Sequence, residues 1–525
     1  MSSHNVKLPQ AFDFGAADGQ IGWWPVLACS VLALISLQML TQKHAIKLNV
    51  PTAGYSSIFE PNWLLRMRFL KQSPTIIEEG YQKFKDSIFR VCRNDGDRFI
   101  VPNKFVDELR YLPEETLSAT MAHAVNFFGE YTSINMIHKG DMSNTQASIH
   151  KLTPMLGRLS ETMKDELDFA LQQEIPKCEG EWVKVQIYDI MLRLISRISG
   201  RIFVGLQACR NETWLAASRD FTEHFFTIAM ILRLVPRFLH PLIVRLLPQY
   251  WRLYNNIETA RQILSPIIRE RRAQEAAGAP GYVKQEDLLQ IMMDSPNAVD
   301  NSPDMLAHRQ LFLSLAAIHT TSLVATNIMY DLCHHPEFIP PLRSEIMNVL
   351  TECGGWEKSA AAKLHTLDSC MKESLRRNPP IQLVFNRQVQ QPIKLSSGIV
   401  LPAGIQITMP ARSLMYDPAN VHGDPTEFDP FRFMRRHDEP AQHGGVPKRL
   451  FAQTDRTNLN FGHGKHACPG RFFADTEIKL ILSHLLLDYD FKYPDGTTRP
   501  KTICIDEVLF PDPSARLLMR KRKTS

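Results

Sequence analysis

The sequence predicts a mainly helical fold with minor sheet, in which a large helical domain and a small sheet region follow one N-terminal transmembrane helix. Three observations support this: an uncharged apolar run near the N-terminus, helical spacing of apolar residues over most of the chain, and short alternating segments around Gly398. The 525 residues contain no repeat and, beyond residue 60, no linker that would divide them. We therefore expect an N-terminal stretch at 1–20, a span at 21–40, a linker at 41–60 and one domain at 61–525.

Composition narrows the class of protein. The 60 Lys and Arg residues against 55 Asp and Glu give a net charge of +5, which is small for this length and argues against a nucleic-acid partner. The nine cysteines are scattered, odd in number and without a CxxC pair, so a reducing compartment fits better than a disulfide framework.

The apolar run from Ile21 to Leu40 carries no charged residue and has the roughly 20 residues that a membrane-crossing helix needs. Trp23 and Trp24 stand at its leading edge, where aromatic rings favour the membrane interface. A cleaved signal peptide is the alternative, but it would have a basic leader, and the leader here is acidic. The basic residues follow the span, so the positive-inside rule places the N-terminus in the lumen and the domain in the cytosol.

The longest predicted helix begins at Pro303, with Ser302 as its N-cap, and no proline interrupts it before Pro336. A helix of this length would measure roughly 50 Å and cross the whole domain. The segment AAIHTTS at its middle combines small residues with hydroxyls. Two interpretations stay open: close helix packing with hydroxyls bonded to carbonyls one turn earlier, or a gap where a flat ligand lies against the helix.

The segment FGHGKHACPG, Phe461 to Gly470, holds one cysteine among three glycines, just before a run with helical spacing. A thiolate is a soft ligand for iron and needs backbone N–H donors around it, which a glycine-rich bend and a following helix N-terminus supply. Phe461 would shield the sulfur side of a macrocycle, and His466 would reach a carboxylate on its rim. An inert buried cysteine is the plain alternative. Zinc held by His463, His466 and Cys468 is another, although no second ligand pair stands nearby.

These motifs together resemble the cytochrome P450 family, and in particular fungal membrane-bound members that modify terpenoid skeletons. Phe461, Gly464, Cys468 and Gly470 match the family's haem-loop pattern FxxGxxxCxG. The order of the segments AAIHTT, KESLRR, FDPFRF and FGHGKHACPG behind a membrane anchor makes the resemblance specific, and it covers nearly the whole chain.

The resemblance also implies a structural network. Glu373 and Arg376 form the family's ExxR motif, and residues three apart share one helix face. Arg432 of the PFRF segment would be their third partner. Such a network would fix the loop that carries Cys468 and take no part in the chemistry.

The sequence departs from the family pattern at the centre of the long helix. His319 stands where an acidic residue usually precedes the threonine, and Ala317 replaces a glycine. Two roles for His319 stay open: a proton relay, or a packed side chain with water carrying the protons. The family's Trp-x-x-x-Arg contact to the haem rim is not evident, whereas Arg387 is similar to the other arginine that binds a propionate.

By resemblance, the protein would be a monooxygenase with haem b, the axial iron ligand being Cys468. Thr320, with His319 and Thr321 beside it, would hydrogen-bond dioxygen and help to deliver protons. Electrons would come from NADPH through an NADPH-cytochrome P450 reductase in the same endoplasmic reticulum membrane, in which the chain would be a single-pass protein. The substrate would be a lipophilic skeleton of secondary metabolism: a terpenoid, diterpenoid or meroterpenoid.

The predicted substrate pocket is apolar. By family position its lining comprises Phe127, Phe128, Leu315, Ile318, Leu383, Val384 and Phe510. The segment from Phe225 to Trp251 is either two core helices joined by a proline loop or, as its mixture of basic and apolar residues favours, a lid that dips into the bilayer. Two rival functions stay open, a haem-thiolate isomerase and a non-enzymatic haem-binding membrane protein.

Overall fold

The computed structural model describes residues 48–135, 142–278, 280–295, 300–356, 359–435 and 450–523. The chain divides into two units, Met1–His44 and Ala45–Ser525, and all the described residues belong to the second. The predicted N-terminal stretch at 1–20 and the predicted span at 21–40 lie outside the described residues.

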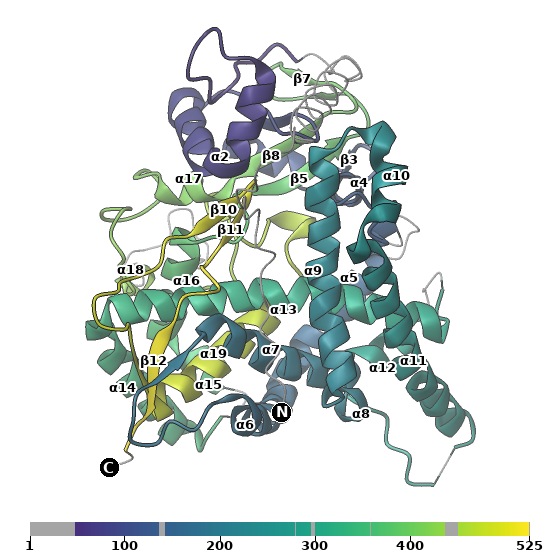
Figure 1. Ribbon diagram of the computed structural model, residues 1–525, viewed down its shortest axis with the longest axis vertical. Helices are drawn as coiled ribbons and strands as arrows, with labels where there is room; N and C mark the ends of the chain where they lie inside the picture. Colours follow the sequence, from purple (N-terminus) through teal and green to yellow (C-terminus); the bar gives the residue numbers. More distant parts are fainter. Residues whose placement is uncertain are drawn as a thin grey trace, which may run out of the picture. The chain divides into compact units, whose positions relative to one another are not determined.

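Helices make up most of the described chain (Figure 1). They are α2 (Asn62–Phe84), α3 (Val106–Leu109), α4 (Ala119–Asn126), α5 (Met142–Leu152), α6 (Leu156–Glu174), α7 (Ile187–Val204), α8 (Leu206–Cys209), α9 (Glu212–Leu234), α10 (His240–Leu246), α11 (Pro248–Ala276), α12 (Leu288–Met293), α13 (Pro303–His334), α14 (Ile339–Cys353), α15 (Ala360–Lys363), α16 (His365–Arg377), α17 (Ala411–Tyr416), α18 (Arg432–Arg435) and α19 (Arg471–Asp488). The predicted fold class, mainly helical with minor sheet, is confirmed.

Helix α13 is the predicted long helix, and its start agrees with the prediction. The Ser302 hydroxyl accepts a hydrogen bond from the Met305 N–H at 3.3 Å, and Pro303 occupies the first turn. Among the described helices, α13 is the one long and apolar enough to cross a membrane, but most of its apolar window is buried inside the fold, as in a core helix. Figure 1 shows it running across the middle of the molecule, with α9 crossing it.

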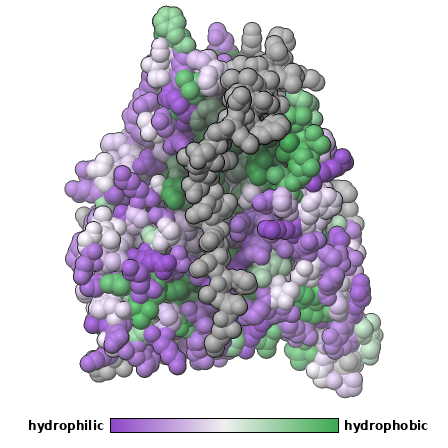
Figure 2. All heavy atoms as spheres, in the orientation of Figure 1, coloured by the Kyte–Doolittle hydropathy of each residue, from purple (hydrophilic) through white to green (hydrophobic). Residues whose placement is uncertain are grey.

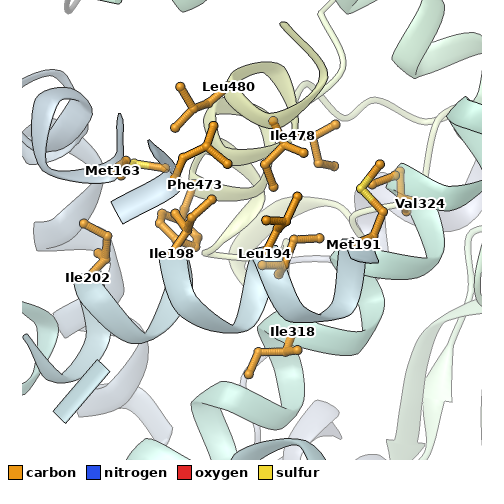
Figure 3. Packing of buried hydrophobic residues seen from close by; sticks show 14 of the residues in the cluster. Met163, Met191, Leu194, Ile198, Ile202, Ile318, Val324, Phe473, Ile478 and Leu480 are labelled. Carbon is orange, nitrogen blue, oxygen red and sulfur yellow. The ribbon is translucent and has the colours of Figure 1, made fainter. Parts of the chain in front are cut away.

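The main hydrophobic core lies where α7 packs between α13 and α19. Figure 3 shows apolar side chains of all three helices meeting there, among them Met191, Leu194 and Ile198 of α7, Ile318 and Val324 of α13, and Phe473 and Ile478 of α19. Because α19 begins directly after the Cys468 segment, this packing fixes the cysteine relative to α13.

The strands form small sheets. They are β1 (Phe89–Val91), β2 (Arg98–Ile100), β3 (Leu117–Ser118), β4 (Val183–Val185), β5 (Leu383–Val389), β6 (Ile393–Lys394), β7 (Val400–Leu401), β8 (Gln406–Pro410), β9 (Tyr489–Lys492), β10 (Ile503–Ile505), β11 (Val508–Phe510) and β12 (Leu517–Lys521). The largest sheet has the order β1-β2-β8-β5-β3, with β2 and β8 parallel and the other neighbours antiparallel. The strands β6, β7 and β8 confirm the sheet predicted around Gly398.

A bulge interrupts the β5–β8 pairing. Val384 pairs with Met409 and Arg387 with Ile407, so the register shifts between Val384 and Arg387. Phe385 within this shift has a φ of 56°, which is unusual for a residue with a bulky side chain. A bulge of this kind re-aims a side chain, and here it is next to Arg387.

The segment from Phe225 to Trp251 contains the end of α9, a proline break and the short helix α10. Val235 and Pro236 are extended, and α11 starts at Pro248. This outline agrees with the interpretation of helices joined by a proline loop. Apolar side chains nevertheless gather on the surface over α10 (Figure 2), where Leu242 and Leu246 are 58% and 70% exposed.

Candidate active site

The Cys468 segment is a tight turn that two glycines make possible. Gly462 and Gly464 have φ values of 68° and 76°, in the left-handed region that favours glycine. A Cβ atom on Gly464 would also come within 2.8 Å of the Arg110 side chain. The turn closes with a 2.7 Å hydrogen bond from the Cys468 N–H to the Phe461 carbonyl. Gly470 has an ordinary φ of −86° and caps α19.

The thiol of Cys468 is exposed, in contrast to the buried thiols of Cys333 and Cys370. Desolvation by the surrounding protein raises the pKa of Cys468, and hydrogen bonds from the backbone N–H groups of Gly470 and Arg471 lower it. Those two N–H groups belong to the start of α19, where the helix dipole also favours negative charge. The sulfur therefore has the donors that a metal-binding thiolate needs.

Helix α13 has an opening beside its middle. Ala316 and Thr320 are exposed although most of α13 is buried, and they lie four residues apart on one face. The Thr320 hydroxyl donates to the Ala316 carbonyl at 2.6 Å. The Thr320 hydroxyl is thus bonded one turn back, as the first interpretation has it, whereas the exposed face at Ala316 and Thr320 does not agree with close helix packing there and leaves room for the ligand of the second interpretation.

A group of basic side chains surrounds one carboxylate, that of Glu114. Arg387 is buried, and its guanidinium lies 4.2 Å from the centre of the Phe385 ring and donates to the Asn386 carbonyl at 2.9 Å. His466 Nε2 lies 3.1 Å from Glu114 Oε1. Burial lowers the pKa of Arg387 to about 10, because the protein provides few acidic neighbours for it.

His123 of α4 belongs to the same basic group and was missed from the sequence. Burial, and then the charge of Arg387, lower its pKa to about 4. The same two causes lower the pKa of His466 to about 4. An anionic ligand bound beside Arg387, His466 and His123, in addition to the Glu114 carboxylate, would relieve the positive potential of this group. Arg158 is on the surface, 3.4 Å from Glu286.

The donor set fits a haem. The exposed thiol of Cys468 has backbone donors, the exposed face at Ala316 and Thr320 has no large side chain, and three basic side chains, Arg387, His466 and His123, match carboxylates such as haem propionates. Zinc fits less well, because both ring nitrogens of His463 lie near other groups: Arg110 Nη1 at 2.6 Å and Thr454 Oγ1 at 3.0 Å.

The predicted network around Glu373 is present and buried. Arg376 makes two 2.8 Å hydrogen bonds to the Glu373 carboxylate, and Arg432 Nε donates to it at 3.1 Å. The side chains of Glu373 and Arg376 are both 0% exposed. Backbone carbonyls accept the other guanidinium hydrogens, including those of Met415 and Glu427. The network ties α16 to the segment that precedes the Cys468 turn.

His319 contacts the helices α7 and α9. Its Nδ1 lies 3.3 Å from the Tyr188 hydroxyl and its Nε2 lies 3.2 Å from the Arg219 carbonyl. Burial lowers the pKa of His319 to about 4, so the ring is neutral near pH 7. These contacts support the packed role for His319 over the role of proton relay.

We expect His319→Gln to make the protein less sensitive to acid. The unfolded state takes up a proton near pH 6.5, whereas the folded state resists protonation until its pKa of about 4. Stability is therefore fully present above pH 6.5, and about 3 kcal/mol is lost as the pH falls through this window. Urea unfolding at several pH values would measure the slope. A loss of turnover at pH 7 with an unchanged acid slope would instead support the proton relay.

The predicted pocket residues lie in different parts of the fold. Phe127 lies beside Phe225 and Phe226 of α9, with ring centres 5.5 and 5.8 Å apart, so these aromatic residues form one wall. Two predictions need correction: Ile318 is in the core against α7 (Figure 3), and Leu383 is in a separate cluster with α2 residues. Both point away because neighbouring positions on a helix or strand face different sides.

The remaining predicted pocket residues are buried or half-buried. Leu315 and Val384 are 8% and 9% exposed, and Phe128 and Phe510 are half-buried. Thr321, beside Thr320, is buried at 5% exposure. Ala316 was not predicted as a site residue. The signal available in the sequence was its position four residues before Thr320, which places both residues on one face of the helix.

The helical fold, the cysteine at the start of α19 and the open face of α13 define a haem-thiolate protein. The family model described as Cytochrome P450 matches residues 119–519. The chain belongs to the cytochrome P450 family, and it is a monooxygenase of that family, as the sequence predicts. Membership implies haem iron with a thiolate ligand.

Known proteins support this assignment. The chain is 46% identical to cytochrome P450 monooxygenase AN1598 of Emericella nidulans, over 94% of this chain and 91% of that protein. It is 44% identical to the ent-kaurene oxidase of Gibberella intermedia, over 93% of this chain and 90% of that protein. The solved structure of cyanobacterial CYP120A1 with retinoic acid bound has the same fold, with a TM-score of 0.64 at 19% identity, covering 91% of this chain and 100% of that one.

Proposed function

We propose that this protein oxidises a terpenoid hydrocarbon skeleton, of the size and polarity of a diterpene, in secondary metabolism. The observation that carries the proposal is the 44% identity to an ent-kaurene oxidase over nearly the full length of both chains. The aromatic wall of Phe127, Phe225 and Phe226 agrees with it, because such a wall binds an apolar skeleton without polar partners.

The proposed roles follow the site geometry. Haem, when bound, supplies the oxygen chemistry. Cys468 would bind its iron, Phe461 would cover the sulfur, and Gly464 and Gly470 would shape the turn. Arg387, His466 and His123 would bind the propionates. The aromatic wall of Phe127, Phe225 and Phe226 would exclude water from the substrate site.

Thr320 would hold and move a proton. Its hydroxyl donates to the Ala316 carbonyl at 2.6 Å and is exposed toward the opening, so it can turn to donate to dioxygen without unfolding α13. Thr321 is buried and lies on another side of the helix, so we give it no direct role.

We expect Thr320→Ala to lower the amount of product per NADPH consumed by about tenfold or more, because one positioned proton donor is lost. Thr321→Ala is the matched control and should change this ratio little. Product yield and NADPH consumption, measured together, check the prediction. Equal yields in Thr320→Ala and the parent would remove Thr320 from the mechanism.

We also propose that the domain lies against a membrane. Besides Leu242 and Leu246, the segment before α2 exposes Ile58 and Phe59 at 92% and 87%. Figure 2 shows apolar atoms near the top of the view over both regions. Together with the predicted span at 21–40, these residues support a single-pass protein of the endoplasmic reticulum membrane with a cytosolic domain. They also support a lipophilic access route at α10.

The test is a turnover assay with the full chain in membranes, NADPH, an NADPH-cytochrome P450 reductase and ent-kaurene. A product that contains an oxygen atom from dioxygen, formed only with NADPH, supports the proposal. NADPH-independent conversion to an isomer would support the haem-thiolate isomerase instead. Binding of haem without any spectral response to ent-kaurene or related diterpenes would support the non-enzymatic alternative.

A further inference from the structure

A buried cluster of six charged side chains lies between α9, the β1–β2 turn and the β10–β11 turn. Three are arginines and three are acids, so their charges cancel. Each side chain is at most 7% exposed. The members are Arg93, Asp95, Arg98, Arg233, Asp506 and Glu507.

Most of the cluster belongs to the sheet region. Arg93 contacts Asp95 at 2.9 Å and Glu507 at 2.7 Å, and Arg98 contacts Asp95 at 2.9 Å. These residues lie on or beside short strands. Arg233 is the member on α9, one residue before that helix ends.

Arg233 connects three separate segments. One guanidinium nitrogen donates to Asp506 in the β10–β11 turn, and the other donates to the Asn126 carbonyl at 2.9 Å. Its Nε lies 3.6 Å from Asp95 Oδ2. Arg98 donates to the Asn126 side-chain oxygen at 2.7 Å. The end of α4 is therefore held by two arginines, one at its backbone and one at its side chain.

Two of these segments, those of Asn126 and Asp506, carry walls of the proposed pocket, as does α9 itself. Phe127 follows Asn126 directly and meets the aromatic residues of α9. The strand β11 follows Asp506 and Glu507, and the Glu507 carbonyl accepts a hydrogen bond from the Gln382 N–H at 2.9 Å, at the start of β5. Any widening of the pocket between α9 and these segments has to move Arg233 away from its partners.

Such a movement is costly while the cluster stays dry. If Arg233 leaves, the acids exceed the remaining arginines by one charge in a buried place, so water has to enter or the acids have to move. We propose that Arg233 is a positioning residue for the substrate pocket: it ties the end of α9 to Asn126 and Asp506 and so sets how readily these walls separate. This inference rests on the proposed function, because the walls are those of the proposed pocket.

Amide hydrogen exchange in the haem-loaded full-length chain tests, without any substrate, whether Arg233 holds the end of α9 to Asn126 and Asp506. We expect Arg233→Met to speed amide exchange in Ala119–Phe128 and at the end of α9. Arg271→Met is the matched control. Arg271 also forms a buried ion pair, 2.8 Å from Asp287 with side chains 4% and 3% exposed, but it joins α11 to the start of α12. It should leave exchange in Ala119–Phe128 unchanged.

The rate at which a bound ligand leaves the haem site tests whether the pocket walls separate more readily without Arg233. We use clotrimazole, a lipophilic azole whose binding is visible in the haem absorption spectrum. Arg233→Met should increase its dissociation rate by about tenfold, since changes in contacts act mainly on dissociation. Arg271→Met should change it by less than about twofold. Arg233→Lys, which keeps the charge and one donor, should restore part of the slow release.

Equal exchange and equal release in Arg233→Met and Arg271→Met would overturn the inference. If Arg233→Met does not fold, Asp506→Asn serves in its place, because it removes the charge that faces Arg233 while keeping the turn. Failure of the proposed function has a different signature: the parent would not oxidise diterpenes, yet the exchange of Ala119–Phe128 would still respond to Arg233.

Discussion

Replacing Cys468 with alanine is expected to abolish the strongly red-shifted Soret band of the reduced, carbon-monoxide-bound protein. Product formation should fall by at least about 10²-fold, because the thiolate sets the reactivity of the iron. The reason lies in the turn geometry. The backbone N–H groups of Gly470 and Arg471 face the Cys468 sulfur and no other thiol described in the fold has this arrangement with a helix start. The measurement is the difference spectrum of membranes that contain equal amounts of each protein.

The matched control is Cys353→Ala. Cys353 is half-buried at the end of α14, where its sulfur lies 3.4 Å from the Ser359 hydroxyl. Its removal should leave the Soret band in place. Cys468→Ser separates ligand chemistry from the loss of the side chain, because serine keeps the shape of cysteine and loses only the soft sulfur. A haem-loaded parent without the red-shifted band would mean another iron ligand, and the roles proposed for the Cys468 turn would have to be abandoned.

The parts of the fold that the sequence predicts well are those with local signals. The helix α13 starts where a serine cap and a proline stand together and ends before the next proline, so its bounds need no knowledge of its neighbours. The Cys468 turn depends on glycines within the same ten residues. The strand order β1-β2-β8-β5-β3 depends on contacts between distant segments, and the alternation around Gly398 gives no information about it.

The candidate site also divides into residues that local sequence signals predict and residues that only the packing of distant segments brings together. Cys468 and Thr320 are predicted from motifs, whereas His123 comes to the Arg387 group through the packing of α4 against β5. The pocket predictions for Ile318 and Leu383 fail because a motif gives the residues near a ligand but not the rotation of a helix or strand about its axis. The Arg233 cluster joins residues that are more than a hundred positions apart in sequence, so only the fold brings them together.

Replacing Glu373 with glutamine is expected to destabilise the folded domain by roughly 3–5 kcal/mol, the cost of leaving buried charges without their partner. Two arginines, Arg376 and Arg432, would lose their counter-charge in a site where Glu373 is fully buried. Such a loss is a large part of the about 5–15 kcal/mol that stabilises a typical domain. We therefore expect little haem-loaded protein at 37 °C and a strongly lowered Tm.

The control is an ion pair on the surface. Asp189 and Arg193 of α7 lie 2.9 Å apart, four residues along the helix, with both side chains more than 40% exposed. Asp189→Asn should cost less than about 1 kcal/mol, because water already screens this pair. Arg376→Lys tests geometry, since lysine keeps the charge but loses the two parallel hydrogen bonds that Arg376 makes to Glu373. Its Tm should lie between those of the parent and Glu373→Gln.

The decisive comparison is turnover per bound haem. Helix α16 holds the chain at two places before the Cys468 turn: Ser369 accepts from the Phe433 N–H at 3.1 Å, and Asp368 accepts from the Phe451 N–H at 2.8 Å. The Phe451 ring then packs against Phe461 at 5.3 Å. Because Glu373 acts through this support, the Glu373→Gln molecules that retain haem should turn over at nearly the parent rate. A variant that keeps its Tm but loses turnover would place Glu373 in the chemistry instead.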